Sequence, residues 1–335
     1  MLSMNLNCYL LHLAGEQIKI TASKQKIDKL LQKKKLDQKT LEKLALVQTI
    51  RNYAVSHLYL NPSGGYIYYA RLKRKKVGWN VSASYPLQFK SYTWWFPVAG
   101  TVPYKGFFQY NMAKKEELRL QKLGLDTRIR ETGAYSTLGW FSDPILSPHL
   151  EYPLYELAEL IIHEMAHATV YIKGDSNFNE SYATFVEEEG VRRFLVFLEG
   201  KNSPTLKKME KENETATIVR QIIQKTGKQL ENLYNSAVDD SQKLKRKQEI
   251  IQDFKNQVVR KNILSSAKSL ERFKKKEFNN EDFIGYLRYN SGTKFFKQEL
   301  ARLGGDIAKF HVEMKKLETL ELAQRARLIS ENNTE

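Results

Sequence analysis

Residues 157–170 read LAELIIHEMAHATV, and this apolar stretch contains an H-E-x-x-H pattern. On a helix, His163 and His167 are four positions apart and share one face, so both imidazoles can bind a single metal ion. Glu164 can then reach a water molecule on that ion. The chain has only 6 histidines among its 335 residues. The plainer alternative is that both histidines bond to solvent or to the backbone.

A third metal ligand is expected, because a catalytic zinc ion usually takes three protein ligands and keeps one position for water. Residues 174–187 read GDSNFNESYATFVE. Here Gly174 can end the first helix, and the turn residues after it can start a second. A hairpin of two helices would bring Glu180 back to the histidines, so we predict Glu180 as the third ligand. The competitor is Glu187, two turns further along and about 10 Å away, so the two glutamates cannot both bind the ion.

The predicted site also defines a chemistry. Zn²⁺ makes its bound water acidic and polarises a carbonyl group, and Glu164 would take the proton of that water and pass it to the leaving amine. The outer nitrogens of the ligand histidines need partners, and Asp143 or Asp175 could serve. Glu187 is kept as such a partner or as a surface residue.

The pair of motifs H-E-x-x-H and N-E-x-x-A is similar to the gluzincin metallopeptidases, in which the glutamate of the second motif is the third zinc ligand. That glutamate corresponds to Glu180. The chain more closely resembles a bacterial family of putative aminopeptidases, from about Leu10 to Leu198 and more weakly beyond. The matching runs are WWFPVAGTVPYKG at 94–106, GAYSTLGW at 133–140 and GDSNFNESYATFVEEEG at 174–190.

The resemblance implies a place for the substrate. Aminopeptidase N-like enzymes carry a G-A-M-E-N segment whose backbone pairs with the peptide, and Gly133, Ala134 and Tyr135 occupy that position here. An edge strand can bind a substrate peptide as one more strand. The glutamate that holds the substrate's free amine is missing from this segment, and Glu131 could replace it. An endopeptidase therefore stays open as an alternative.

Further substrate contacts are expected beyond residue 200. The segments Phe278-Asn279-Asn280 and 286–290 resemble a recurring Asn-Asn and Tyr-Asn element of the putative aminopeptidases. We predict that Asn280 contacts substrate and that the hydroxyl of Tyr289 donates to the oxyanion, with Tyr135 and Tyr182 as alternatives. For each tyrosine taken alone, packing in the core is the alternative role.

Hydrophobic periodicity indicates an α+β fold. Helical spacing is seen at 17–35, 40–57, 111–123, 153–172 and 178–198, while strand-like alternation covers 66–108, 126–130 and 133–138. Residues 205–330 show helical spacing with little β-branched alternation. With the resemblance, we expect a zincin-like catalytic domain at 1–200, with a twisted sheet and paired active-site helices. A helical lobe at 201–335 would close the cleft.

The net charge of +16 is spread along the chain, and no nucleic-acid motif accompanies it. A solvated basic surface is the expected reading, with weak contact to an anionic membrane surface as an alternative. No specific nucleic acid is expected as a partner, and the oligomeric state is left open. The single cysteine, Cys8, excludes an internal disulfide.

Residues 1–7 lack the basic start of a lipoprotein signal, so a cytoplasmic location is expected. Some members of the resembled family look like envelope lipoproteins, which keeps the cell envelope as the alternative. We predict a zinc-dependent peptidase with a peptide substrate, and by resemblance an aminopeptidase. The alternatives are a zinc endopeptidase and a non-catalytic basic helical binding protein.

Overall fold

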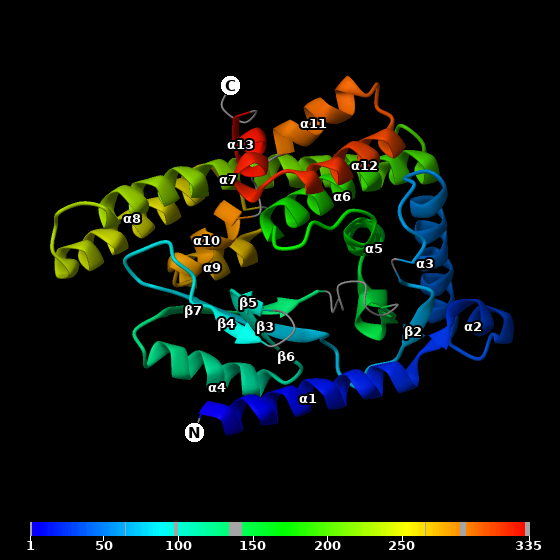
Figure 1. Cartoon of the computed structure of the whole chain (residues 1–335), viewed down its shortest axis with the longest axis horizontal. Coiled ribbons are helices and arrows are strands. Elements are labelled where there is room, and N and C mark those ends of the chain that lie inside the picture. Colours follow the sequence, from blue (N-terminus) through cyan, green and yellow to red (C-terminus); the bar gives the residue numbers. More distant parts are fainter. Residues whose placement is uncertain are drawn as a thin grey trace. The chain divides into compact units, whose positions relative to one another are not determined.

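A computed structural model of the chain describes residues 2–63, 65–96, 100–133, 143–264, 266–288 and 293–331 (Figure 1). The fold is α+β, as predicted: helices dominate, and the strands within the described residues form small sheets. The chain divides into two compact units. Unit 1 comprises Met1–Val77, Thr132–Lys207 and Asn290–Glu335, and unit 2 comprises Gly78–Glu131 and Lys208–Tyr289.

Unit 1 contains the helices that carry the predicted metal ligands. Its helical elements are α1 (Leu2–Ser23), α2 (Ile27–Lys33), α3 (Gln38–Ser56), η1 (Ser147–Glu151), α5 (Leu154–Thr169), α6 (Ser176–Glu199), α11 (Thr293–Arg302), α12 (Ile307–Lys316), η2 (Leu317–Thr319) and α13 (Leu322–Glu331). The central pair is α5 and α6, which pack along each other. In Figure 1, α3 lies beside α5, and α11 and α12 lie along α6.

A small sheet in unit 1 joins three distant parts of the sequence. Its strands are β1 (Gln25–Lys26), β2 (Tyr68–Ala70) and β8 (Ile145–Leu146). Tyr69 of β2 is in antiparallel register with Gln25 on one side and in parallel register with Ile145 on the other. Because η1 follows β8 directly and leads into α5, this sheet helps to fix where α5 begins.

Unit 2 combines two sheets with helices. Its elements are β3 (Gly78–Ser84), β4 (Trp94–Phe96), β5 (Gly100–Val102), β6 (Tyr104–Phe107), α4 (Tyr110–Gln121), β7 (Asp126–Thr132), α8 (Asp240–Arg260), α9 (Ala267–Lys275) and α10 (Asn280–Arg288), with most of α7 (Pro204–Tyr234). One sheet has the order β6-β3-β7, and β4 and β5 form a hairpin. The helical core of unit 2 is built around the buried rings of Phe254 and Phe283, where α8 contacts α10.

The helical region predicted after residue 205 is confirmed by α7 to α13. The prediction of one helix at 17–35 is wrong: α1 ends at Ser23, and residues 25–26 form β1 before α2 begins. The second segment of unit 1 ends at Lys207, whereas residues 78–131 of the predicted catalytic domain belong to unit 2 and residues 290–335 of the predicted lobe belong to unit 1. The division into a catalytic domain and a closing lobe stays a prediction.

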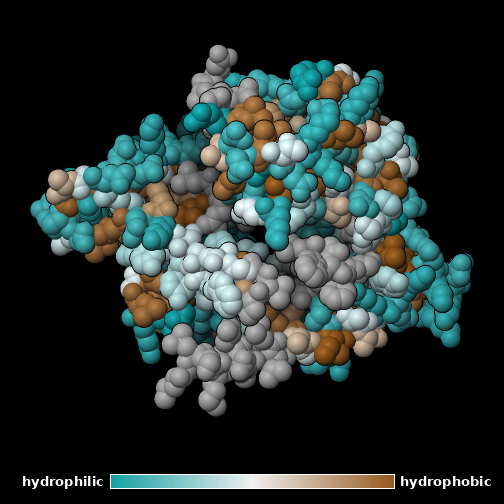
Figure 2. Space-filling view, in the orientation of Figure 1, coloured by the Kyte–Doolittle hydropathy of each residue, from teal (hydrophilic) through white to brown (hydrophobic). Residues whose placement is uncertain are grey.

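Figure 2 shows hydrophilic side chains over most of the face drawn, with hydrophobic residues scattered among them. Among the helices of the described residues, none combines the length and the apolar character that crossing a bilayer requires.

Candidate metal centre

The two histidines lie on the side of α5 opposite its apolar face. The apolar face is fully covered, and its buried residues are Leu157, Ala158, Ile161, Ile162, Met165 and Ala166. The helix ends at Thr169, whose hydroxyl accepts a hydrogen bond from the Asn61 N–H at 2.9 Å. The Asn61 side chain donates to the Ala168 carbonyl at 3.1 Å. With the apolar side packed and the end fixed, His163 and His167 are both turned toward α6.

The connection from α5 to α6 is held by two polar side chains. The Asp175 carboxylate accepts a hydrogen bond from the Phe178 N–H at 3.0 Å and so caps α6. The Asn179 side chain bonds to both the N–H and the carbonyl of Ile172, each at 2.8 Å. The sequence offered Asp175 as a partner for a ligand histidine. In the structure it caps α6 instead. Together these bonds set where Glu180 stands, one turn into α6.

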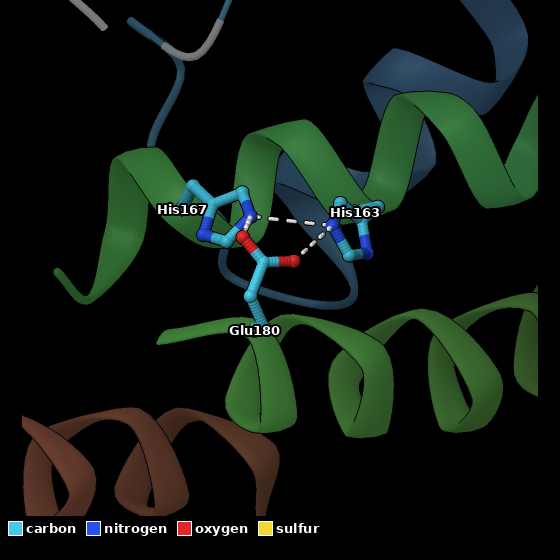
Figure 3. A group of neighbouring side chains, drawn as sticks. All are labelled: His163, His167 and Glu180. Carbon is cyan, nitrogen blue, oxygen red and sulfur yellow. Dashed lines mark hydrogen bonds and ion pairs between the residues drawn. The ribbon is translucent and has the colours of Figure 1, made fainter. Parts of the chain in front are cut away.

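Three donor groups converge between the two helices (Figure 3). The Nε2 atoms of His163 and His167 are 3.2 Å apart. In the Glu180 carboxylate, Oε2 lies 3.7 Å from Nε2 of His163, and Oε1 lies 3.7 Å from Nε2 of His167. For a tetrahedral ion bound at about 2.1 Å, neighbouring donor atoms lie about 3.4 Å apart. The observed separations bracket that value. The group can therefore hold a metal ion, in the arrangement predicted from the sequence.

Glu187 takes a different position from Glu180. Its Oε2 atom lies 2.7 Å from Nδ1 of His163, which is the nitrogen on the far side of the ring from Glu180. A carboxylate at this nitrogen fixes the orientation and tautomer of a metal-binding imidazole and makes it a stronger ligand. Of the two competing glutamates, Glu180 thus lies at the donor cluster and Glu187 lies behind His163.

The electrostatics of the cluster fit a site prepared for a cation. Burial lowers the pKa of His163, but hydrogen bonds to Glu180 and Glu187 raise it more, to about 10. Burial and the adjacent charge of His163 lower the pKa of His167 to about 4. Burial raises the pKa of Glu180, yet its bond to His163 and the neighbouring histidine charges bring it below the usual value. The carboxylates of Glu180 and Glu187 thus favour a positive charge at the His163 ring.

Glu164 follows His163 on α5 and is half-buried. Its negative charge is close enough to raise the pKa of His163. After burial, it is also the next cause of the raised pKa of the Tyr66 phenol. Tyr66 is buried and adopts a φ of 60°, a conformation that a residue with a side chain rarely takes. The predicted base therefore lies within electrostatic reach of the donor cluster.

The predicted substrate segment is described only at its first residue. Gly133 is exposed, and a Cβ atom there would lie 3.3 Å from the Tyr152 hydroxyl, which explains why glycine fits at this point. Ala134, Tyr135 and Tyr289 lie outside the described residues, so their roles stay predictions.

Two other predicted residues are buried in structural networks. The Asn280 side chain accepts a hydrogen bond from the Tyr234 hydroxyl at 2.6 Å and donates to the Tyr85 carbonyl at 2.8 Å. Its contact with substrate stays a prediction. Tyr182 is fully buried and bonds to Nδ1 of His311 at 2.7 Å, so its hydroxyl is used within the core and the alternative role at the oxyanion is wrong.

Sequence reasoning missed the part played by Asn179. This residue precedes Glu180 in the N-E-x-x-A motif, and that position was a usable signal. An asparagine there can bond to both the N–H and the carbonyl of one residue, because its side-chain amide both accepts and donates. The first residue of the motif thus holds the loop that precedes Glu180.

Comparison with known proteins gives one match. The sequence profile of a family described as "Putative aminopeptidase" matches residues 8–329. No curated protein and no solved structure matches the chain. The match spans both units and includes α5 and α6, with the donor cluster between them. The chain belongs to this family of putative aminopeptidases.

Proposed function

We propose that the protein is a zinc-dependent peptidase that acts as an aminopeptidase. The observation that carries the proposal is the donor cluster, in which two imidazole nitrogens and a carboxylate converge at separations suited to a tetrahedral ion. A His₂Glu set is one that catalytic zinc uses in peptidases. The family to which the chain belongs supports a peptidase, and so a peptide substrate.

Each residue of the site has a distinct task in this proposal. His163, His167 and Glu180 would hold Zn²⁺, which supplies a Lewis acid that polarises the scissile carbonyl and acidifies water. Glu164 would remove a proton from that water and deliver it to the leaving amine, which makes it base and then acid. Glu187 would keep the His163 ring in the orientation and tautomer that leave Nε2 available for the ion.

The experiment combines metal analysis with a pair of peptides. The purified protein is expected to contain one zinc ion per chain and to release the first residue of a peptide with a free amino terminus. The same peptide with an acetylated amino terminus should resist an aminopeptidase, because its charged amine is lost. Cleavage of both peptides at internal bonds would identify an endopeptidase instead.

The matched variants are Glu164→Gln and Glu156→Gln, both on α5. Glu156 lies in the first turn of the helix, seven residues before His163, and accepts a bond from the Tyr155 hydroxyl. Glu156→Gln should cleave like the unmodified protein, whereas Glu164→Gln should lose turnover. Absence of zinc and of cleavage, with tight binding to a polyanion, would overturn the proposal in favour of a non-catalytic basic protein.

A further inference from the structure

A buried ion pair joins the C-terminal helix to the start of α6. Nε of Arg325, on α13, lies 2.7 Å from Oδ2 of Asp175, and the two side chains are only 5% and 7% exposed. Both residues belong to unit 1. A charge buried this deeply is costly unless it is paired and fully hydrogen-bonded. The pair therefore fixes the relation between two segments 150 residues apart in sequence.

The Asp175 carboxylate is committed on both of its oxygens. While Oδ2 meets Arg325, Oδ1 caps α6 at the Phe178 N–H. The main-chain carbonyl of Asp175 also accepts a hydrogen bond from the Asn179 N–H at 3.1 Å. Asp175 thus fixes the point where α6 begins, and the orientation of its side chain sets the position of the first turn of that helix.

The Arg325 guanidinium has further bonds that hold it in place. Its Nη1 atom donates to the carbonyls of Leu317 and Leu320, at 2.9 and 2.6 Å. These carbonyls belong to the turn between α12 and α13, so one planar group ties that turn to the beginning of α6. An arginine suits this task because its fork of donors is rigid and always charged.

We propose that Arg325 is a positioning residue for the metal ligand Glu180, acting through Asp175. The inference rests on the proposed function and names a part of its site that lies at the other end of the chain. Glu180 stands five residues after Asp175, and the lower part of α6 is anchored separately where Gly190 meets Ile162 of α5. The start of α6 is held by the Asp175 cap and by the bonds between the Asn179 side chain and Ile172. Because metal–ligand distances tolerate only about ±0.2 Å, a small change in the first turn moves the Glu180 oxygens out of range.

The test compares two substitutions of Arg325 with a matched control in unit 2. Arg325→Met removes the cation, and Arg325→Lys keeps the charge for Asp175 but gives up the fork that also reaches two carbonyls. The control is Lys247→Met, because Lys247 is 2% exposed, pairs with Asp126 and donates to the Pro86 carbonyl at 2.8 Å. Both Met variants thus remove one buried cation from an ion pair.

Three measurements are made at a temperature where circular dichroism shows each variant folded. Zinc affinity is measured by competition with a chromogenic chelator, and the visible spectrum of the Co²⁺-loaded protein reports the coordination of the ion. Hydrogen exchange of the α6 start is followed in the metal-free protein. Arg325→Met should bind zinc at least about tenfold more weakly, with an altered Co²⁺ spectrum and faster exchange at 176–182, and Arg325→Lys should fall between.

Lys247→Met should keep the zinc affinity and Co²⁺ spectrum of the unmodified protein while losing thermal stability. Unchanged zinc affinity in Arg325→Met, or an equal loss in Lys247→Met, overturns the positioning role. If the unmodified protein binds no zinc, the proposed function fails, and exchange in the metal-free protein then decides whether Arg325 positions the start of α6. Faster exchange at 176–182 in Arg325→Met alone supports it, and equal exchange refutes it.

Discussion

The contact between Glu187 and His163 makes a quantitative prediction about metal affinity. Replacing Glu187 with Gln keeps the length of the side chain but removes the negative charge 2.7 Å from Nδ1. Loss of a partner behind a metal-binding histidine typically weakens metal binding by about 10- to 100-fold. This corresponds to about 1.4 to 2.8 kcal/mol. Both side chains are only about a fifth exposed, so solvent can replace the lost charge only in part.

Competition with a fluorescent chelator at a pH of about 7.5 measures this loss directly. Glu180→Gln, which changes the proposed ligand, should weaken binding more than Glu187→Gln does. Glu189→Gln is the control on the same helix, since Glu189 pairs with Arg192 and Arg193 instead of a histidine. Equal affinity in Glu187→Gln and the unmodified protein would refute the orienting role. A loss equal to that of Glu180→Gln would mean that Glu187 is itself a ligand.

Three further predictions concern the base, the proton inventory and the acid stability. Glu164→Gln should keep its zinc and lose at least about 100-fold in turnover, since it removes the general base; full activity would exclude that role. Because the pKa of His163 is raised to about 10, zinc must displace its proton below that pH. Zinc affinity should therefore fall with falling pH, and calorimetry in buffers of different ionisation enthalpy should find about one proton released; none released contradicts this. Burial lowers the pKa of His149 to about 4, whereas the value in an unfolded chain is about 6.5. The free energy of unfolding should therefore fall as the pH drops from about 6.5 to about 4, and His149 should account for about 3 kcal/mol of that fall. Urea unfolding should show a smaller decline in His149→Gln, and an equal decline in both proteins would reject the assignment.

The helices of the site could be predicted because their signals are local. The apolar spacing before His163 and the turn residues after Gly174 predicted helices at 153–172 and 178–198, and the structure has α5 and α6 at nearly the same places. The N-terminal segment could not be predicted in this way. Its break at residues 25–26 comes from pairing with Tyr68 and Tyr69, which are more than 40 residues away in the sequence.

The same distinction separates the parts of the site. The two histidines and Glu180 follow from motif spacing, because each needs only its own helix and a short connection. The partner of Asp175 could not be found, since Arg325 is 150 residues away and nothing near it in sequence marks it. Asp175, one of the two candidate histidine partners, does not serve as one for a related reason: a carboxylate just before a helix is used first by the unpaired N–H groups of that helix.

The antiparallel register of α5 and α6 explains how a short connection still delivers a complete site. Ile162 contacts Gly190, His163 contacts Glu187, and His167 contacts Glu180. As the residue number increases along α5, the number of the contacting residue on α6 decreases. Seven residues separate the two glutamates, which is close to two helical turns, and both therefore lie on the face toward α5. One carboxylate reaches each side of the His163 ring. The register depends on this spacing within α6 more than on loop length, so the 12 residues between His167 and Glu180 suffice once Asp175 and Asn179 close the turn.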